Sequence, residues 1–185
     1  GILKIKLEGT PWLEYILKGA QVVDIIERQI SFTKEYEDLG RQNPAWQSVA
    51  RSVEGATASL PMREIRITVT TGSLEIFADP LFDKVFYNLI DNALRYGGET
   101  MTEIRILCQE VPEGLVIVVE DDGNGIVEED KSRLFTKGFG KNTGLGLFLS
   151  REILAITGVT IAETGTPGKG ARFEILVPPD AYRFA

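Results

Sequence analysis

The chain has 185 residues, of which 43% are hydrophobic and 25% charged, and its formal net charge at pH 7 is −7. These values are typical of a soluble globular protein with one substantial core. The negative charge argues against a nucleic-acid partner or a basic membrane-surface patch, and no apolar run approaches the roughly 20 residues that a membrane helix needs.

Two residue types exclude further classes of site. The single cysteine, Cys108, rules out an intramolecular disulfide and fits a reducing compartment. Histidine is absent, which removes most zinc sites, every catalytic triad built on histidine and any phosphohistidine within this chain. We therefore expect a cytoplasmic protein without these chemistries.

A long helix is the first element that the sequence predicts, over residues 11–39. Thr10 can cap it, Pro11 suits its first turn and Gly40 ends it. It would be roughly 40 Å long, and a lone helix of this length cannot bury its own apolar stripe. We expect it to pair with another helix, on a second copy or in a part of the protein not present here; packing on its own domain is the alternative. The stripe has a coiled-coil-like spacing and includes Leu13, Ile16, Ala20, Val23 and Ile30.

The turn-rich segment 40–44 predicts a domain boundary, with residues 1–40 on one side and 41–185 on the other. Beyond it, helical and strand periodicities are interleaved. This order predicts an α+β fold: a two-layer α/β sandwich with helices on one face of a mixed sheet, preceded by one long helix. The predicted helices cover 49–60, 80–97 and 145–157, and the predicted strands cover 46–49, 65–71, 74–78, 103–110, 115–120, 159–164 and 171–177.

The helix that begins near Pro80 has an unusual polar edge. Asp79 is its predicted N-cap, Pro80 its first residue and Gly97 part of its stop. Asparagine is a mediocre helix former, so two copies four residues apart on one edge call for a reason, although a solvated surface helix is the plainer interpretation. The apolar stripe is Phe82, Val85, Phe86, Leu89 and Ala93, and its margin carries Asn88, Asn92, Arg95 and Tyr96.

A short glycine-containing segment, residues 121–126, follows directly on a predicted strand. Gly123 and Gly125 permit a sharp turn and a close approach of the backbone to a ligand. Asp121 could accept a hydrogen bond from an amino group inside a pocket. The alternative is a simple Asp-Gly turn.

Residues 138–147, Gly-Phe-Gly-Lys-Asn-Thr-Gly-Leu-Gly-Leu, form a loop that leads into a helix. Backbone N–H groups at a helix N-terminus attract phosphate oxygens, Lys141 adds positive charge and Thr143 adds a hydroxyl donor. Two other phosphate loops do not match. Phe135 stands where a P-loop needs glycine and Asn142 where it needs Ser or Thr, and a long loop separates this segment from the strand that a dinucleotide-binding motif requires.

In this order and spacing, the three segments resemble the conserved boxes of the catalytic, ATP-binding domain of sensor histidine kinases, within the gyrase/Hsp90/histidine-kinase/MutL superfamily. The resemblance extends over residues 46–178. It implies the histidine-kinase ATPase fold, with ATP and Mg²⁺ as cofactors. By this match Asn92 holds Mg²⁺, Arg95 approaches phosphate, Tyr96 packs by the adenine and Asp121 receives the adenine amino group.

The resemblance also covers the segment that closes over the nucleotide. Residues 133–139 resemble the phenylalanine box of this lid, and Gly144 and Gly146 belong to the second glycine box. Asn142 departs from the pattern, because many relatives have glycine there. No catalytic residue is expected within the chain, and Asn92 is the expected metal ligand. The residues that the resemblance places at the nucleotide are Asn88, Asn92, Arg95, Tyr96, Asp121, Gly123, Gly125, Ile126, Phe135, Lys141, Thr143, Gly144, Leu145, Gly146 and Leu147.

The implied activity is transfer of the ATP γ-phosphate to a histidine on a segment absent from this chain, and onward to a response-regulator aspartate. Residues 1–40 resemble the second helix of the family's dimerisation and phosphoacceptor hairpin. The implied partners are ATP or ADP, the phosphoacceptor helix, a receiver domain and a second copy of the full-length protein, but no nucleic acid. The expected location is cytoplasmic, including the cytoplasmic part of a membrane-bound sensor.

Two alternatives remain open. One is an ATP-hydrolysing member of the same superfamily, and the other is a non-catalytic nucleotide-binding scaffold, which the missing histidine would suit. Hydrolytic members carry a glutamate one turn before the metal-binding asparagine, to activate water. This sequence has Asn88 there, and an amide does not take a proton at neutral pH. The substitution therefore favours the kinase.

Overall fold

The computed structural model describes residues 12–140 and 143–185. Thr10, Pro11, Lys141 and Asn142, which carry sequence-based predictions, lie outside the described residues. The helices are α2 (Trp12–Asp38), α3 (Val49–Ala58), α4 (Phe82–Tyr96), α5 (Glu128–Lys131), α6 (Gly146–Ala155) and the short 3-10 helix η1 (Pro179–Ala181). The strands are β1 (Ala45–Ser48), β2 (Arg66–Thr70), β3 (Leu74–Ala78), β4 (Glu103–Val111), β5 (Gly114–Asp121), β6 (Thr160–Glu163), β7 (Arg172–Val177) and β8 (Tyr182–Phe184).

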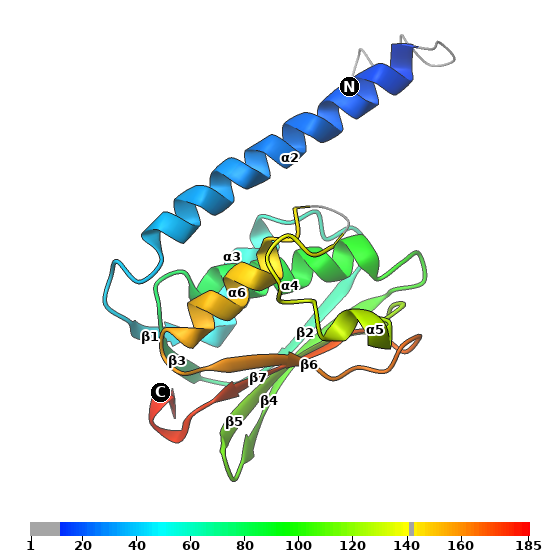
Figure 1. The fold of residues 1–185 in the computed structure, drawn as a ribbon. Helices are drawn as coiled ribbons and strands as arrows, with labels where there is room; N and C mark the ends of the chain where they lie inside the picture. Colours follow the sequence, from blue (N-terminus) through cyan, green and yellow to red (C-terminus); the bar gives the residue numbers. More distant parts are fainter. Residues whose placement is uncertain (1–11, 141–142) are drawn as a thin grey trace.

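The strands form a larger sheet in the order β2-β4-β5-β7-β6 and a smaller one in the order β1-β3-β8. The larger sheet is mixed, since β2 and β4 are parallel and its other neighbours antiparallel. Helices α3, α4 and α6 lie together over one face of the sheet (Figure 1). The predicted sandwich, with helices on one face and a long helix in front, is confirmed.

The core lies between the helical layer and the sheet. The whole apolar stripe predicted for α4, namely Phe82, Val85, Phe86, Leu89 and Ala93, is buried. It packs in one cluster with alternate residues of the central strands, among them Ile104, Ile106, Leu115 and Ile117. Because the apolar side of α4 faces the sheet, its polar margin is left at the edge of the helical layer.

The two strands on either side of Gly72 lie in different sheets. The sequence joins them through a short turn, yet β2 pairs with β4 in the larger sheet and β3 pairs with β1 and β8 in the smaller one. Alternating side chains predict that a segment is extended, but they do not choose its partner. The partner is chosen by packing between distant segments.

Asp79 also has a different role from the one predicted. Helix α4 begins at Phe82, and its N-cap Leu81 has no side-chain cap. The Asp79 carboxylate accepts hydrogen bonds from the backbone of Leu81 (2.9 Å) and of Gly40 (3.1 Å), so it ties the linker after α2 to the turn before α4. Several predicted ends shift by one or two residues, and α5, η1 and β8 were not predicted.

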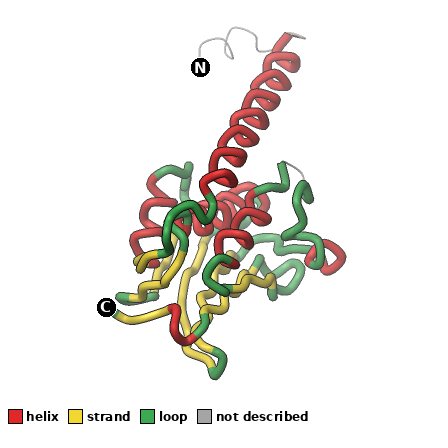
Figure 2. The backbone as a smooth tube through the Cα atoms, turned by 60° about the vertical axis from the view of Figure 1, so that its left-hand side comes forward, coloured by secondary structure: helices red, strands yellow, loops and turns green. Residues whose placement is uncertain are grey.

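Helix α2 extends beyond the rest of the molecule, as the turned view shows (Figure 2). None of its residues is buried. Ile16, Val23, Ile26 and Ile30 remain exposed, and contact with the domain is made mainly near the C-terminal end, where Phe32 and Tyr36 meet Phe148 of α6. Pairing of the exposed stripe with another helix stays a prediction.

Candidate functional site

A cavity of about 670 Å³ lies at the polar margin of α4. Its walls are α4, the segment after β5, the segment that leads into α6, and one side of α2. This volume is in the range of pockets that take a ligand of nucleotide size. Most of the predicted site residues line it: Asn88, Asn92, Arg95, Tyr96, Asp121, Gly125, Ile126, Thr143, Gly144, Leu145, Gly146 and Leu147.

Three of the predicted site residues are not among the described residues that line the cavity. Lys141 lies outside the described residues. Gly123 does not line the cavity, and neither does Phe135. The Phe135 ring instead packs edge-on against Phe173, with ring centroids 6.4 Å apart, so it anchors its segment on the sheet. Phe139 of the same segment lines the cavity.

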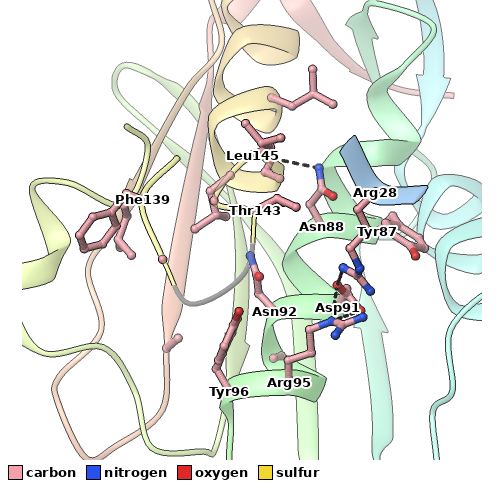
Figure 3. A pocket seen from close by; sticks show the side chains of 18 of the residues that line it. Arg28, Tyr87, Asn88, Asp91, Asn92, Arg95, Tyr96, Phe139, Thr143 and Leu145 are labelled. Atoms are coloured by element: carbon pink, nitrogen blue, oxygen red, sulfur yellow. Dashed lines mark hydrogen bonds and ion pairs between the residues drawn. The ribbon is translucent and has the colours of Figure 1, made fainter. Parts of the chain in front are cut away.

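The two asparagines of α4 have different surroundings. The Asn88 amide nitrogen donates to the carbonyl oxygen of Gly146 (3.0 Å) and to the hydroxyl of Ser150 (3.1 Å). Asn92 makes no hydrogen bond with any described residue, and Figure 3 shows it pointing from α4 toward Thr143. Asn88 is therefore engaged in joining α4 to α6, whereas no described residue occupies the donor or the acceptor of the Asn92 carboxamide.

Asp121 is held at the end of β5 by its own loop. Its Oδ1 accepts from the backbone N–H groups of Gly123 (2.9 Å) and Ala171 (3.2 Å). Its Oδ2 receives no hydrogen bond from the described part of the chain. Burial raises the pKa of Asp121, and the two backbone hydrogen bonds oppose that rise. The result is an oriented acceptor in a partly desolvated place.

The glycines after Asp121 are required by close packing. A Cβ at Gly123 would lie 2.4 Å from the carbonyl oxygen of Gly97 at the end of α4, and Asn124 donates its backbone N–H to that same carbonyl (2.9 Å). Gly125 has φ +68°, and a Cβ there would lie 2.8 Å from the Gly170 carbonyl oxygen. The loop can thus pass between α4 and the β6–β7 turn only if positions 123 and 125 carry no side chain.

A pair of arginines on one carboxylate is the feature that the sequence analysis missed. Arg95 Nε donates to both oxygens of Asp91, at 2.8 Å each, and Arg28 Nη1 of α2 lies 3.3 Å from Asp91 Oδ2. Asp91 is buried enough to raise its pKa, which the Arg28 charge opposes. The spacing of Asp91 and Arg95 could have predicted their pair. No local signal indicates Arg28, which is 63 positions away.

Two features were sought in the described residues and not found. Nowhere in residues 12–140 and 143–185 do three or more acidic or cysteine side chains gather in a way that could hold a metal ion. Within the same ranges, no helix has the length and apolarity needed to cross a membrane.

Comparison with known proteins agrees with this fold. Residues 78–181 match the family described as histidine kinase-, DNA gyrase B-, and HSP90-like ATPase. The match covers more than half of the chain and includes α4, the Asp121 loop and the start of α6. The chain therefore belongs to this ATPase family, and the resemblance to histidine-kinase catalytic domains is confirmed.

Curated relatives are sensor proteins. The alginate biosynthesis sensor protein KinB of Pseudomonas aeruginosa is 38% identical over 104 residues, which are 52% of this chain and 17% of that protein. Sensor protein SrrB of Staphylococcus aureus is 28% identical over 181 residues, 86% of this chain and 31% of that protein. The chain thus spans less than a third of the length of either relative.

Solved structures share the fold at low sequence identity. Full-length ShkA, in a crystal structure with AMPPNP, has a TM-score of 0.70 and 19% identity over 94% of this chain and 39% of that one. The Acinetobacter baumannii histidine kinase AdeS has a TM-score of 0.64 and 22% identity over 96% and 92% of the two chains. Both alignments include the long helix as well as the sandwich.

Proposed function

We propose that this chain is the ATP-binding catalytic part of a sensor histidine kinase, which presents the γ-phosphate of Mg·ATP to a histidine supplied by another segment. The main support is that the Asn92 carboxamide, which has no hydrogen bond with a described residue, and the oriented Asp121 carboxylate line the same cavity. An ATPase family member with this pair has one group suited to a metal ion and one suited to an adenine amino group.

The donor set around Asn92 fits Mg²⁺ bound together with a nucleotide. Mg²⁺ prefers oxygen ligands, keeps several waters and takes few protein ligands when phosphates are present. The Asn92 oxygen would be one ligand, and phosphate and water oxygens would complete the shell. Bound there, the ion would neutralise charge on the triphosphate, which is the main requirement of phosphoryl transfer.

The remaining residues would bind and orient the nucleotide. Asp121 would accept from the adenine amino group through its unengaged Oδ2. Tyr96 and Ile126 would contact the base, while Gly144 and the N-terminus of α6 would face the phosphates, where backbone N–H groups attract anions. Lys141 and Arg95 would add positive charge. Gly123 and Phe135 would act indirectly, by shaping the loop and anchoring the lid segment.

Hydrolysis is the less favoured activity. A water molecule attacking the γ-phosphate needs a base, and Asn88, one turn before Asn92, cannot serve. Its nitrogen is moreover committed to Gly146 and Ser150. A histidine nucleophile needs no such base, because the neutral imidazole already carries a lone pair.

Residues 1–40 and 41–185 would form two functional parts. The first would be the second helix of a dimerisation and phosphoacceptor hairpin, and the exposed stripe of α2 supports pairing with further helices. The acceptor histidine, a receiver domain and a second copy would then be partners of the whole protein. A part that binds ATP and meets a receiver domain would lie in the cytoplasm.

The test is phosphotransfer in trans. The chain is mixed with γ-labelled Mg·ATP and a separate helical peptide that carries a histidine of the family's phosphoacceptor type. Acid-labile label on the peptide, with little release of free phosphate, is the expected result. Rapid phosphate release without label transfer would favour the hydrolase, and nucleotide binding with neither reaction would favour the scaffold.

A further inference from the structure

Asp91 lies between two arginines that come from different parts of the molecule. Arg95 is on its own helix, one turn later, and Arg28 is on α2. Figure 3 shows both guanidinium groups directed at the Asp91 carboxylate. Arg95 uses only Nε for this contact, and its two terminal nitrogens have no hydrogen-bond partner among the described residues. Arg95 is thus held through one nitrogen at the cavity wall.

Arg28 makes α2 part of the same wall. It lies 12 residues before Gly40, about 18 Å along the helix at 1.5 Å per residue, and Gly40 is fastened to the domain by Asp79. A second ion pair, between Glu35 and Lys84 of α4 (2.9 Å), lies between these two points. The Arg28–Asp91 contact therefore lies farther from Gly40 along α2 than the Glu35–Lys84 ion pair and the ring contacts that Phe32 and Tyr36 make with Phe148.

We propose that Asp91 is a positioning residue that couples the attachment of α2 to phosphate binding, because Arg95 can leave it for a phosphate only while Arg28 remains as its partner. The inference rests on the proposed nucleotide site. It concerns only contacts within this chain.

The argument follows from the charges. The Asp91 side chain is 13% exposed, against 34% for Arg95 and 27% for Arg28. If Arg95 turned to a phosphate while α2 was detached, a mostly buried carboxylate would be left without a partner, which is costly. With α2 attached, Arg28 remains, and the repulsion between the two guanidinium groups is relieved. Attachment of α2 and phosphate binding should therefore strengthen each other, and this effect is reciprocal.

The first experiment compares ATP with adenosine, which has no phosphates. Arg28→Gln should weaken ATP binding about five- to tenfold and leave adenosine binding unchanged. Lys18→Gln is the matched control, since Lys18 carries the same charge on the same helix and, among the described residues, pairs only with Glu14 of that helix (2.7 Å). Arg28→Lys keeps the charge and should restore most of the affinity.

The second experiment tests Asp91 as the mediator. Asp91→Asn releases Arg95, so ATP affinity should be at least that of the parent chain, and Arg28→Gln should then have no further effect on it. The reciprocal effect is measured by spin labels at Gln21→Cys and Gln109→Cys in a Cys108→Ser background. Mg·ATP should narrow the distance distribution, and Arg28→Gln should abolish this narrowing.

Three results would overturn the coupling. They are equal ATP affinities for Arg28→Gln and Lys18→Gln, an equal loss of ATP and adenosine binding in Arg28→Gln, and an Arg28→Gln effect that persists beside Asp91→Asn. If the parent chain binds no ATP, the proposed function itself fails and the coupling fails with it. If the parent binds ATP and Arg28→Gln matches its control, only the coupling fails.

Discussion

The amide nitrogen of Asn88 donates a hydrogen bond to the carbonyl oxygen of Gly146, over 3.0 Å. This contact joins the middle of α4 to the first residue of α6. The buried hydroxyl of Ser150 completes a triangle, since it accepts from Asn88 and donates to the same carbonyl. An asparagine that the sequence marks as a ligand candidate therefore also holds two helices of the site together.

Asn88→Ala should lower the stability of the fold. It removes two hydrogen bonds, each worth about 0.5–1.5 kcal/mol, so the free energy of unfolding should fall by about 1–3 kcal/mol in urea denaturation. The loss stays moderate because Ser150 continues to donate to Gly146. Asn43→Ala, in the exposed linker, is the control and should change stability by less than about 0.5 kcal/mol. Equal effects of the two substitutions would remove the structural role from Asn88.

Asn92→Ala should lower the Mg²⁺-dependent affinity for ATP without lowering the stability of the fold. Asn92 has no hydrogen bond with a described residue, so its loss should leave the unfolding midpoint nearly unchanged. The gain in ATP affinity that Mg²⁺ confers should fall by about tenfold or more. Calorimetric titrations with Mg²⁺ and with a chelator measure that gain directly. Mg²⁺-dependence equal to that of the parent chain would take Asn92 out of the metal site.

Asp121→Asn should weaken the binding of ATP. An amide oxygen still accepts a hydrogen bond, but it lacks the charge that strengthens one. Hydrogen bonds to charged groups are worth about 1.5–3 kcal/mol. Losing about 1.4 kcal/mol of this would lower the ATP affinity about tenfold. Competition between ATP and GTP on the parent chain is the companion measurement. Indifference to the base would contradict the role of Asp121.

Although Asp121→Asn should weaken ATP binding, it should make the fold more stable at neutral pH. Since burial raises the pKa of Asp121, the folded chain binds this proton more readily than the unfolded chain, and stability falls as pH rises between the two pKa values. The charged carboxylate thus destabilises the fold at neutral pH. Asp121→Asn should raise the melting temperature at pH 7, and the gain should vanish below about pH 3.9, the ordinary aspartate value. A gain that is independent of pH would show that ionisation is not its cause.

Phe148→Ala should loosen α2. Its ring lies 6.4 Å from that of Phe32 and 6.1 Å from that of Tyr36, centroid to centroid, and aromatic pairs contribute about 0.5–1.5 kcal/mol each. Hydrogen exchange near the C-terminal end of α2 should become about tenfold faster, while the central strands stay protected. Phe77→Ala, which removes a ring contact with Trp46 on the small sheet, is the control. It should leave exchange in α2 unchanged.

The sequence by itself determined the local elements and most of the candidate residues of the site. Helical periodicity predicts the buried stripe of α4 because it repeats over four turns, and all five strands of the larger sheet were predicted to within two residues at each end. Residue type and turn geometry made Asn92, Asp121 and the glycines candidates, and the resemblance to the kinase family assigned their roles. The boundaries were less certain, as Asp79 illustrates: its carboxylate is shared with a distant linker.

Tertiary structure decided which segments meet. It separated β2 from β3, although only a short turn joins them, and it turned Phe135 toward the sheet and Phe139 toward the cavity. It also brought Arg28 to Asp91 across 63 positions. Such contacts depend on the summed burial of segments far apart in the chain, so no short window of sequence contains the information that selects them.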